Sequence, residues 1–264
     1  MKLLVKVRYD GSAFSGSQVQ PDLPTVQGVL TDASRQIFGF DCDVTGCSRT
    51  DAGVHALSYC AAISPRGERP PDDWCPVPIP KVPRAFNSKL PPAVAVCGAC
   101  RVDDSFHPRY DVVSKEYVYF ISDSPVRDPF LVSRAWQIGR RIGDRALSAM
   151  KSACPGFLGK HDFRAFMASG SDVTDTEREI YSIDVIRGDD GLIKITVSAD
   201  GFLYNMVRII AGTLVAVAFE KIREEEIPEI IASRDRSRAG QTAPPEGLYL
   251  SDVRYNKPIT WLYE

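Results

Sequence analysis

The sequence predicts an α+β protein made of two similar halves with mainly antiparallel sheets. Two observations lead to this fold class. Strand and helix signals alternate through the first hundred residues, and a second set of strands, helices and a hairpin begins near Asp104. No residue-level repeat is visible, so the similarity of the halves is inferred from element order alone. We expect a first domain at 1–103 and a second at 104–264.

In the first half, the clearest element is a helix over 26–38. Apolar residues recur on one face of this segment, Thr25 precedes it as a capping residue, and Gly39 follows it as a stop signal. Strands are expected at 2–10, 42–48, 56–64 and 93–102, and a short helix at 81–90. The Pro-rich stretch 66–80 predicts an irregular insertion.

In the second half, a hairpin and a long apolar helix stand out. Segment 178–200 reads as two strands around a GDDG turn, where Gly191 supplies a positive φ. Segment 202–219 is apolar enough for a buried core helix. Further strands are expected at 115–122 and 247–255, and further helices at 142–155 and 223–235.

Composition narrows the function classes. The net charge is −2, from 32 Lys+Arg against 34 Asp+Glu, so the strong basicity of many nucleic-acid proteins is absent. We expect no signal peptide and no membrane span, since Asn205 and Arg208 interrupt the longest apolar stretch. Seven cysteines with no export signal indicate reduced thiols in the cytoplasm. Only Cys97 and Cys100 form a CxxC, and with three histidines in the chain we expect no metal.

Asp51 is the best candidate for a catalytic group. It lies in GCSRTDAGVHAL, between two expected strands, and Arg49 can keep a neighbouring carboxylate ionised. Such a carboxylate suits nucleophilic or general-base chemistry. The alternative is an Asx-turn in which Asp51 binds its own backbone. We expect His55 to be a structural hydrogen-bonding residue and not a metal ligand.

Three other side chains have both a structural and a functional interpretation. Arg208, inside an apolar helix, either extends to solvent or pairs with a buried anion such as Asp51. Tyr117 and Tyr119 lie two apart on one strand face, and either pack in the core or offer a platform on which a base stacks.

Basic side chains are concentrated in two stretches. Segment 74–100 contains Lys and Arg but no acidic residue, and segment 233–238 contains three arginines. These stretches are either solvated faces or parts of a phosphate-binding surface.

Eight motifs in fixed order carry a resemblance to a known family. They are YDGSAFSGSQVQ, SRTDAGVHA, FNSKLPPAVAV, FHPRY, SKEYVYF, HDFRAF, FLYNMVRIIAG and APPEGLYL. Together they resemble the TruA family of tRNA pseudouridine synthases along nearly the whole chain. Two departures are visible: Ser17 stands where the family usually has tryptophan, and Ser48 where it usually has glycine.

The resemblance implies a pseudouridine synthase fold, in which the two halves are joined around a central cleft with helices on the outer faces. It also implies the isomerisation of uridine to pseudouridine at positions 38–40 of the tRNA anticodon arm. It implies that Asp51 is the catalytic aspartate, that Tyr117 stacks on the target base and that Arg208 pairs with the aspartate. Leu248 matches an apolar wall of the pocket, and Arg49 matches an arginine that helps to expel the target nucleotide.

The resemblance further implies tRNA as the substrate and a homodimer as the assembly. No cofactor is expected, because the reaction leaves the numbers of atoms and electrons unchanged. Two other function classes are alternatives to the isomerase. A catalytically inactive tRNA-binding or tRNA-folding protein on the same scaffold would bind tRNA and release it unchanged. A small-molecule glycosidase usually needs two carboxylates at one bond, and only Asp51 stands out here.

Overall fold

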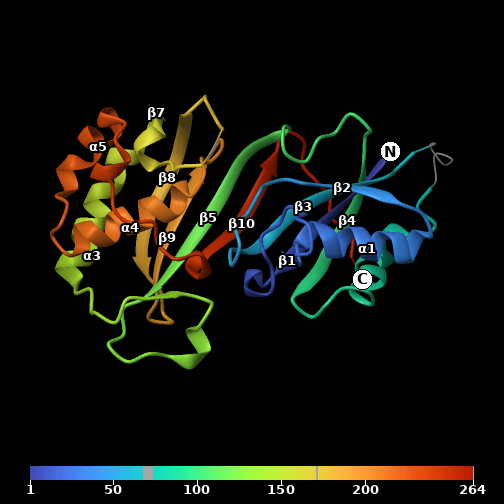
Figure 1. Ribbon diagram of the computed structural model, residues 1–264, viewed down its shortest axis with the longest axis horizontal. Helices are drawn as coiled ribbons and strands as arrows, with labels where there is room; N and C mark the ends of the chain where they lie inside the picture. Colours follow the sequence, from blue (N-terminus) through green and yellow to red (C-terminus); the bar gives the residue numbers. More distant parts are fainter. Residues whose placement is uncertain (68–73, 171, 264) are drawn as a thin grey trace. The chain divides into compact units, whose positions relative to one another are not determined.

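The computed structural model describes residues 1–67, 74–170 and 172–263 (Figure 1). The chain divides into two compact units, the first formed by Met1–Val113 and Leu250–Glu264 and the second by Ser114–Tyr249. The sequence predicts a boundary at 103/104, ten residues before this division. Most of the last strand, from Leu250 onward, belongs to the first unit, which the order of elements in the sequence does not indicate.

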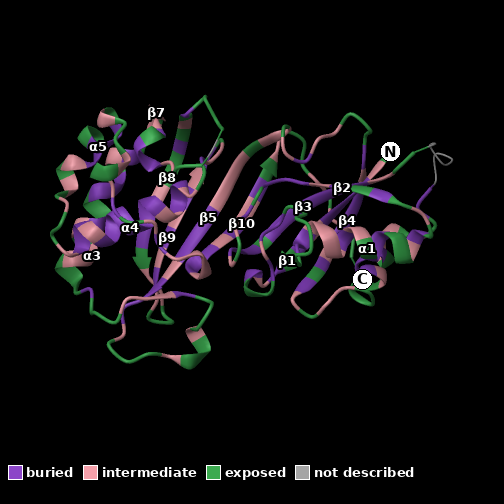
Figure 2. Cartoon of the chain, in the orientation of Figure 1, coloured by how far each residue is buried: buried purple, intermediate pink, exposed green. Residues whose placement is uncertain are grey.

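The sheet of the first unit is built on the strand β1 (Lys2–Tyr9). This strand pairs in antiparallel fashion with β3 (His55–Pro65) on one side and with β4 (Val94–Val102) on the other. The short β2 (Cys42–Gly46) pairs with the end of β3. Most of β1 is apolar and buried, as the purple colour in Figure 2 shows, and its buried residues are Leu3, Leu4, Val5, Val7 and Tyr9.

Two helices pack against this sheet. Helix α1 (Val26–Phe38) begins and ends as predicted, with the Thr25 side chain accepting from Gly28 N–H and with Gly39 in the left-handed conformation at φ 81°. Helix α2 (Val82–Asn87) contacts both α1 and β4. Phe38 lies on the buried face of α1. Its ring packs against the Trp74 ring, with 5.2 Å between the centroids.

Part of the predicted irregular insertion 66–80 lies outside the described residues, namely 68–73. The rest contains only a 3-10 turn, Ile79–Lys81, and Trp74 Nε1 donates to the carbonyl of Met1 at 2.9 Å. The indole therefore ties this segment to the start of β1.

The sheet of the second unit has the strand order β5-β9-β8-β7. Its members are paired in antiparallel fashion: β5 (Val112–Ser122), β9 (Ile193–Ala199), β8 (Glu177–Arg187) and β7 (Gly159–Asp162). The predicted hairpin is confirmed as β8–β9, with Gly191 at φ 79°. The two-residue β6 (Trp136–Gln137) pairs in parallel with β5 and was not predicted.

The described part of this unit has three α-helices: α3 (Asp144–Ala153), α4 (Met206–Ala218) and α5 (Ile227–Ser233). Helix α4 contacts α3 and is buried on nearly all sides, as expected for so apolar a segment. It begins four residues later than the predicted 202–219, because Asn205 adopts a left-handed conformation at φ 60°. No helix in the described part of the chain has the length and apolar character that a membrane span requires.

A buried ion pair anchors the end of β5. The Asp123 carboxylate accepts from Arg187 Nη2 at 2.9 Å and from the backbone N–H of Ile142 at 2.9 Å. Burial alone would raise the pKa of Asp123, but the Arg187 and Ile142 hydrogen bonds lower it below its usual range. The carboxylate therefore stays charged and holds the segment before α3 to the sheet.

Candidate active site

Loop 47–54 joins β2 to β3 and carries both Arg49 and Asp51. Within it, Val54 N–H donates to the carbonyl of Asp51 at 3.2 Å, and Gly53 takes a φ of 80° that closes the turn. Arg49 is exposed and Asp51 is half-buried. The loop is thus a tight turn between two strands, as the sequence predicts.

The segment before α1 clamps this loop. Ser17 N–H donates to the carbonyl of Thr50 at 3.0 Å, and Thr50 N–H donates back to Ser17 Oγ at 2.8 Å. The carbonyl of Ser17 also accepts from Gln27 N–H, at the N-terminus of α1, at 2.9 Å. One buried serine therefore connects the start of a helix to the residue next to Asp51.

Further hydrogen bonds hold the loop from the sheet. The hydroxyls of Tyr9 and Thr50 lie 2.8 Å apart, and Tyr59 Oη donates to the carbonyl of Ser48 at 3.2 Å. Gly46 leaves room for the Tyr59 hydroxyl, since a Cβ there would lie 1.7 Å from it. The loop is therefore preorganised, which a catalytic carboxylate requires.

His55 is a structural residue, as the sequence indicates. It is 2% exposed, and its Nδ1 accepts from Gly11 N–H at 3.0 Å. A Cβ on Gly11 would lie 2.0 Å from the carbonyl of Val54, so the two segments pack backbone to backbone.

Tyr117 and Tyr119 lie on β5 of the second unit. Tyr117 is 6% exposed and meets Phe202 edge to face at 5.1 Å between ring centroids. Tyr119 is fully buried and donates its hydroxyl to the carbonyl of Pro244 at 2.7 Å. Burial raises the pKa of Tyr119 far above its usual range, so its hydroxyl stays protonated. Core packing is therefore the role of Tyr119.

Arg208, on α4, does not simply extend to solvent. Its Nε donates to the carbonyl of Ala243 at 2.7 Å and its Nη1 to Asn205 Oδ1 at 2.6 Å. The carbonyl of Arg208 in turn accepts from Ala243 N–H at 3.1 Å. These bonds fix the direction of the guanidinium and tie α4 to the segment 243–248.

Leu248 begins β10 (Leu248–Tyr255) and is 7% exposed. It follows a 3-10 turn, Pro245–Gly247, whose Gly247 has room for no side chain because a Cβ there would lie 2.6 Å from the Tyr119 ring. Segment 243–248 thus contacts both Arg208 and Tyr119.

The predicted site residues fall into two groups. Arg49 and Asp51 lie together in one loop of the first unit, and Tyr117, Arg208 and Leu248 lie in the second unit. The pairing of Asp51 with Arg208 stays a prediction. The sequence predicts no role for Ser17 or Thr50. The one feature that marks either residue is that Ser17 stands where the resembled family usually has tryptophan.

The cysteines are free thiols. Burial raises the pKa of Cys100 to about 11, so this thiol rarely forms the reactive thiolate at pH 7. Within residues 1–67, 74–170 and 172–263, no three His, Cys, Asp or Glu side chains form a group that could hold a metal ion.

Comparison with known proteins identifies the class. The model of a family described as tRNA pseudouridine synthase matches residues 6–111 and 153–256. The chain is therefore an enzyme of the class that isomerises uridine in RNA. More narrowly, it belongs to the tRNA pseudouridine synthase family.

Its relatives match it from end to end. A tRNA pseudouridine synthase A of Ruminiclostridium cellulolyticum is 41% identical over 96% of this chain and 99% of its own length. One from Brevibacillus brevis is 40% identical over the same shares of the two chains. Among solved structures, a Cbf5-Nop10-Gar1 complex matches 94% of this chain and 48% of its own at 12% identity, with a TM-score of 0.36.

Proposed function

We propose that this protein isomerises uridine to pseudouridine at positions 38–40 in the anticodon arm of tRNA. The single observation that carries the proposal is the identity of about 40% to tRNA pseudouridine synthase A proteins over nearly the whole chain. The clamped loop 47–54 supports it, because the reaction needs a carboxylate held in a fixed position.

Asp51 acts on the sugar in this proposal. Breaking the C–N glycosidic bond leaves positive character on the ribose, and a carboxylate either traps it covalently or removes a sugar proton. The uracil then turns and rejoins the sugar through carbon. Because no atom or electron is gained or lost, the residues supply the chemistry without a cofactor.

The other residues bind and expose the nucleotide. Arg49 helps to expel it from the RNA stack, at a cost of a few kcal/mol. Tyr117 stacks on the detached base, Leu248 forms an apolar wall beside it, and Arg208 keeps the Asp51 carboxylate charged. The hydrogen bonds that fix the direction of the Arg208 guanidinium support its role as a positioned cation.

The test is incubation with an unmodified tRNA transcript, followed by mapping of pseudouridine in the anticodon arm. We expect the wild type to modify one or more of positions 38–40, and Asp51→Asn to lose at least about 10³-fold in rate while still binding tRNA. Asp103→Asn, an exposed carboxylate in the same unit, is the matched control. Normal modification by Asp51→Asn would overturn the role of Asp51, and tRNA bound but unchanged by the wild type would favour the inactive binding protein.

The assembly and location follow the family resemblance. We propose a homodimer in the cytoplasm, since one subunit of 264 residues offers a small surface for a whole tRNA. Light scattering of the protein alone and with tRNA measures the assembly, and a monomeric mass in both samples would contradict the dimer.

A further inference from the structure

A small pocket lies beside the candidate catalytic loop in the first unit. Its volume is about 170 Å³, and its lining includes Arg49, Arg109, Ser17, Thr45, Gln18 and Gln27. The lining has two arginines, several hydroxyls and two amides, and no carboxylate. A site of this composition suits an oxyanion, because guanidinium forks and hydroxyls donate to phosphate oxygens.

Arg109 is the unusual member of this lining. Its Nε is buried and has no hydrogen-bond partner among the described residues. The salt bridges in the described part of the chain include neither Arg49 nor Arg109. A buried N–H without a partner is destabilising, and an anion in the pocket would supply the missing acceptor.

The backbone holds Arg109 in place. His107 Nδ1 accepts from the backbone N–H groups of Arg109 and Tyr110, each at 3.2 Å, and Asp111 N–H donates to the carbonyl of His107 at 3.1 Å. Burial and the Lys2 and Arg109 cations lower the pKa of His107, so the ring is neutral at pH 7 and able to accept. The side chain of Arg109 therefore starts from a fixed turn.

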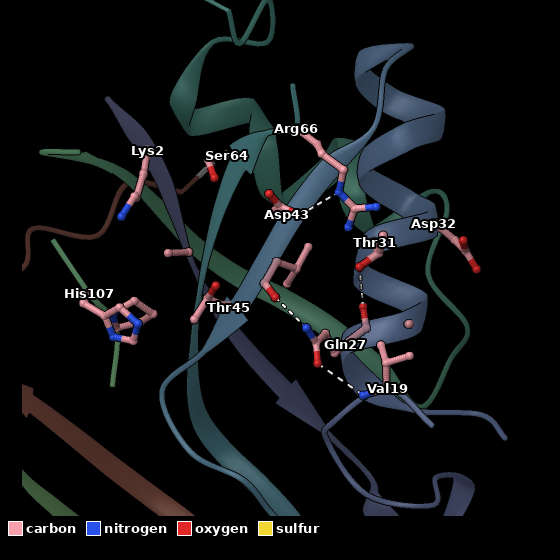
Figure 3. A pocket seen from close by; sticks show the side chains of 14 residues that line it. Lys2, Val19, Gln27, Thr31, Asp32, Asp43, Thr45, Ser64, Arg66 and His107 are labelled. Carbon is pink, nitrogen blue, oxygen red and sulfur yellow. Dashed lines mark hydrogen bonds and ion pairs between the residues drawn. The ribbon is translucent and has the colours of Figure 1, made fainter. Parts of the chain in front are cut away.

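A wider groove next to this pocket suits phosphate less well. Its volume is about 720 Å³, and it shares Gln27, Val44 and Thr45 with the small pocket. In Figure 3, Asp43 lies beside Arg66, and Asp32 lies on the helix at the side of this groove away from Lys2 and His107. Arg66 pairs with Asp43 at 2.7 Å, and Asp32 adds a further negative charge. The small pocket is the part of this surface that combines cations with an absence of carboxylates.

We propose that the pocket formed by Arg109, Arg49, Ser17 and Thr45 binds a backbone phosphate of the RNA substrate, next to the nucleotide that is turned out. This inference rests on the proposed function for the identity of the RNA. It gives Arg109 a positioning role: the phosphate is held beside loop 47–54, and the target nucleotide is thereby brought to the loop. Ser17 has two roles, since it clamps Thr50 and its small side chain leaves the pocket open.

The experiment compares Arg109→Gln with the wild type on an unmodified tRNA transcript. We expect the dissociation constant to rise about tenfold at low salt, and the slope of log affinity against log salt to fall in magnitude by about 0.7–1, the value of one phosphate contact. The rate at saturating tRNA should change less than about twofold, because Arg109 does not touch the reacting atoms. Arg109→Lys should recover part of the affinity.

Arg35→Gln, an exposed arginine on α1 outside both pockets, is the matched control and should leave affinity and slope unchanged. Unchanged affinity of Arg109→Gln overturns the inference. So does a loss of affinity with an unchanged salt slope and a lowered melting temperature, since this shows a purely structural role. If the wild type binds tRNA with the expected slope but forms no pseudouridine, the proposed function fails and the phosphate pocket stands.

Discussion

Ser17 shows how one small side chain can hold a catalytic loop. It is 1% exposed, and its Oγ accepts the N–H of Thr50, the residue before Asp51. The same Oγ lies 3.5 Å from the carbonyl of Ser48. The two positions at which this chain departs from the resembled family are therefore in contact. A larger side chain at position 17 would have to replace these bonds with packing.

Ser17→Ala removes the acceptor of a buried N–H. We expect the free energy of unfolding to fall by about 1–3 kcal/mol, because Thr50 N–H loses its partner. We also expect a slower rate of pseudouridine formation, since displacement of a catalytic group by about 1 Å can cost 10²-fold in rate. Urea unfolding and single-turnover assays measure the two effects.

The control for this variant is Ser105→Ala, an exposed serine in the same unit. It should match the wild type in both measurements. A Ser17→Ala protein with wild-type stability and rate would show that the clamp through Oγ is dispensable and that the backbone bond from Ser17 to Thr50 suffices.

At the scale of elements, α4 is positioned by close contact with the segment 239–243. A Cβ on Gly212 would lie 1.8 Å from the carbonyl of Gln241, and Gly240 N–H donates to Thr213 Oγ1 at 2.9 Å. Helix and segment thus touch backbone to backbone. The hydrogen bonds between Arg208 and Ala243 depend on this close approach. The packing of Gly212 against Gln241 therefore helps to fix the position of Arg208, a candidate site residue.

Gly212→Ala should therefore disturb both the second unit and Arg208. The segment 239–243 must move away from α4, and we expect a loss of about 1–3 kcal/mol in the free energy of unfolding, as for overpacked cores. Pseudouridine formation should fall with it. Gly143→Ala is the control, because a Cβ there meets no atom within 4 Å. Equal free energies of unfolding for the two variants would show that segment 239–243 moves away from α4 without a loss of stability.

The whole molecule shows which features a sequence can predict. Helix 26–38 was predicted to the residue, because its cap at Thr25, its apolar face and its stop at Gly39 are all local signals. The start of α4 was predicted four residues too early, since the conformation of Asn205 depends on its surroundings.

The same limit applies to the candidate site. Arg49 and Asp51 were found because they share one short motif. The Ser17–Thr50 clamp was not found, because its partners are 33 residues apart and meet only when the chain folds. Arg109 was missed for the same reason: only the folded chain places it in a pocket with Arg49.

The seven cysteines report on opening of both units. Burial raises the pKa of Cys42 to about 11 in the first unit and that of Cys154 to about 12 in the second, so at pH 8 their thiolates are scarce as well as inaccessible. Cys97 is the exception, because its thiol is only half-buried. In the native protein a coloured disulfide reagent should react fast with Cys97, and Cys97→Ser should lose this fast phase. The remaining thiols should react at least about 100-fold more slowly, at rates that rise with urea as each unit opens.

Peptide mapping of the labelled thiols then distinguishes opening of the two units, since Cys42 lies in the first unit and Cys154 in the second. Immediate reaction of all seven thiols in buffer would mean that neither core is closed.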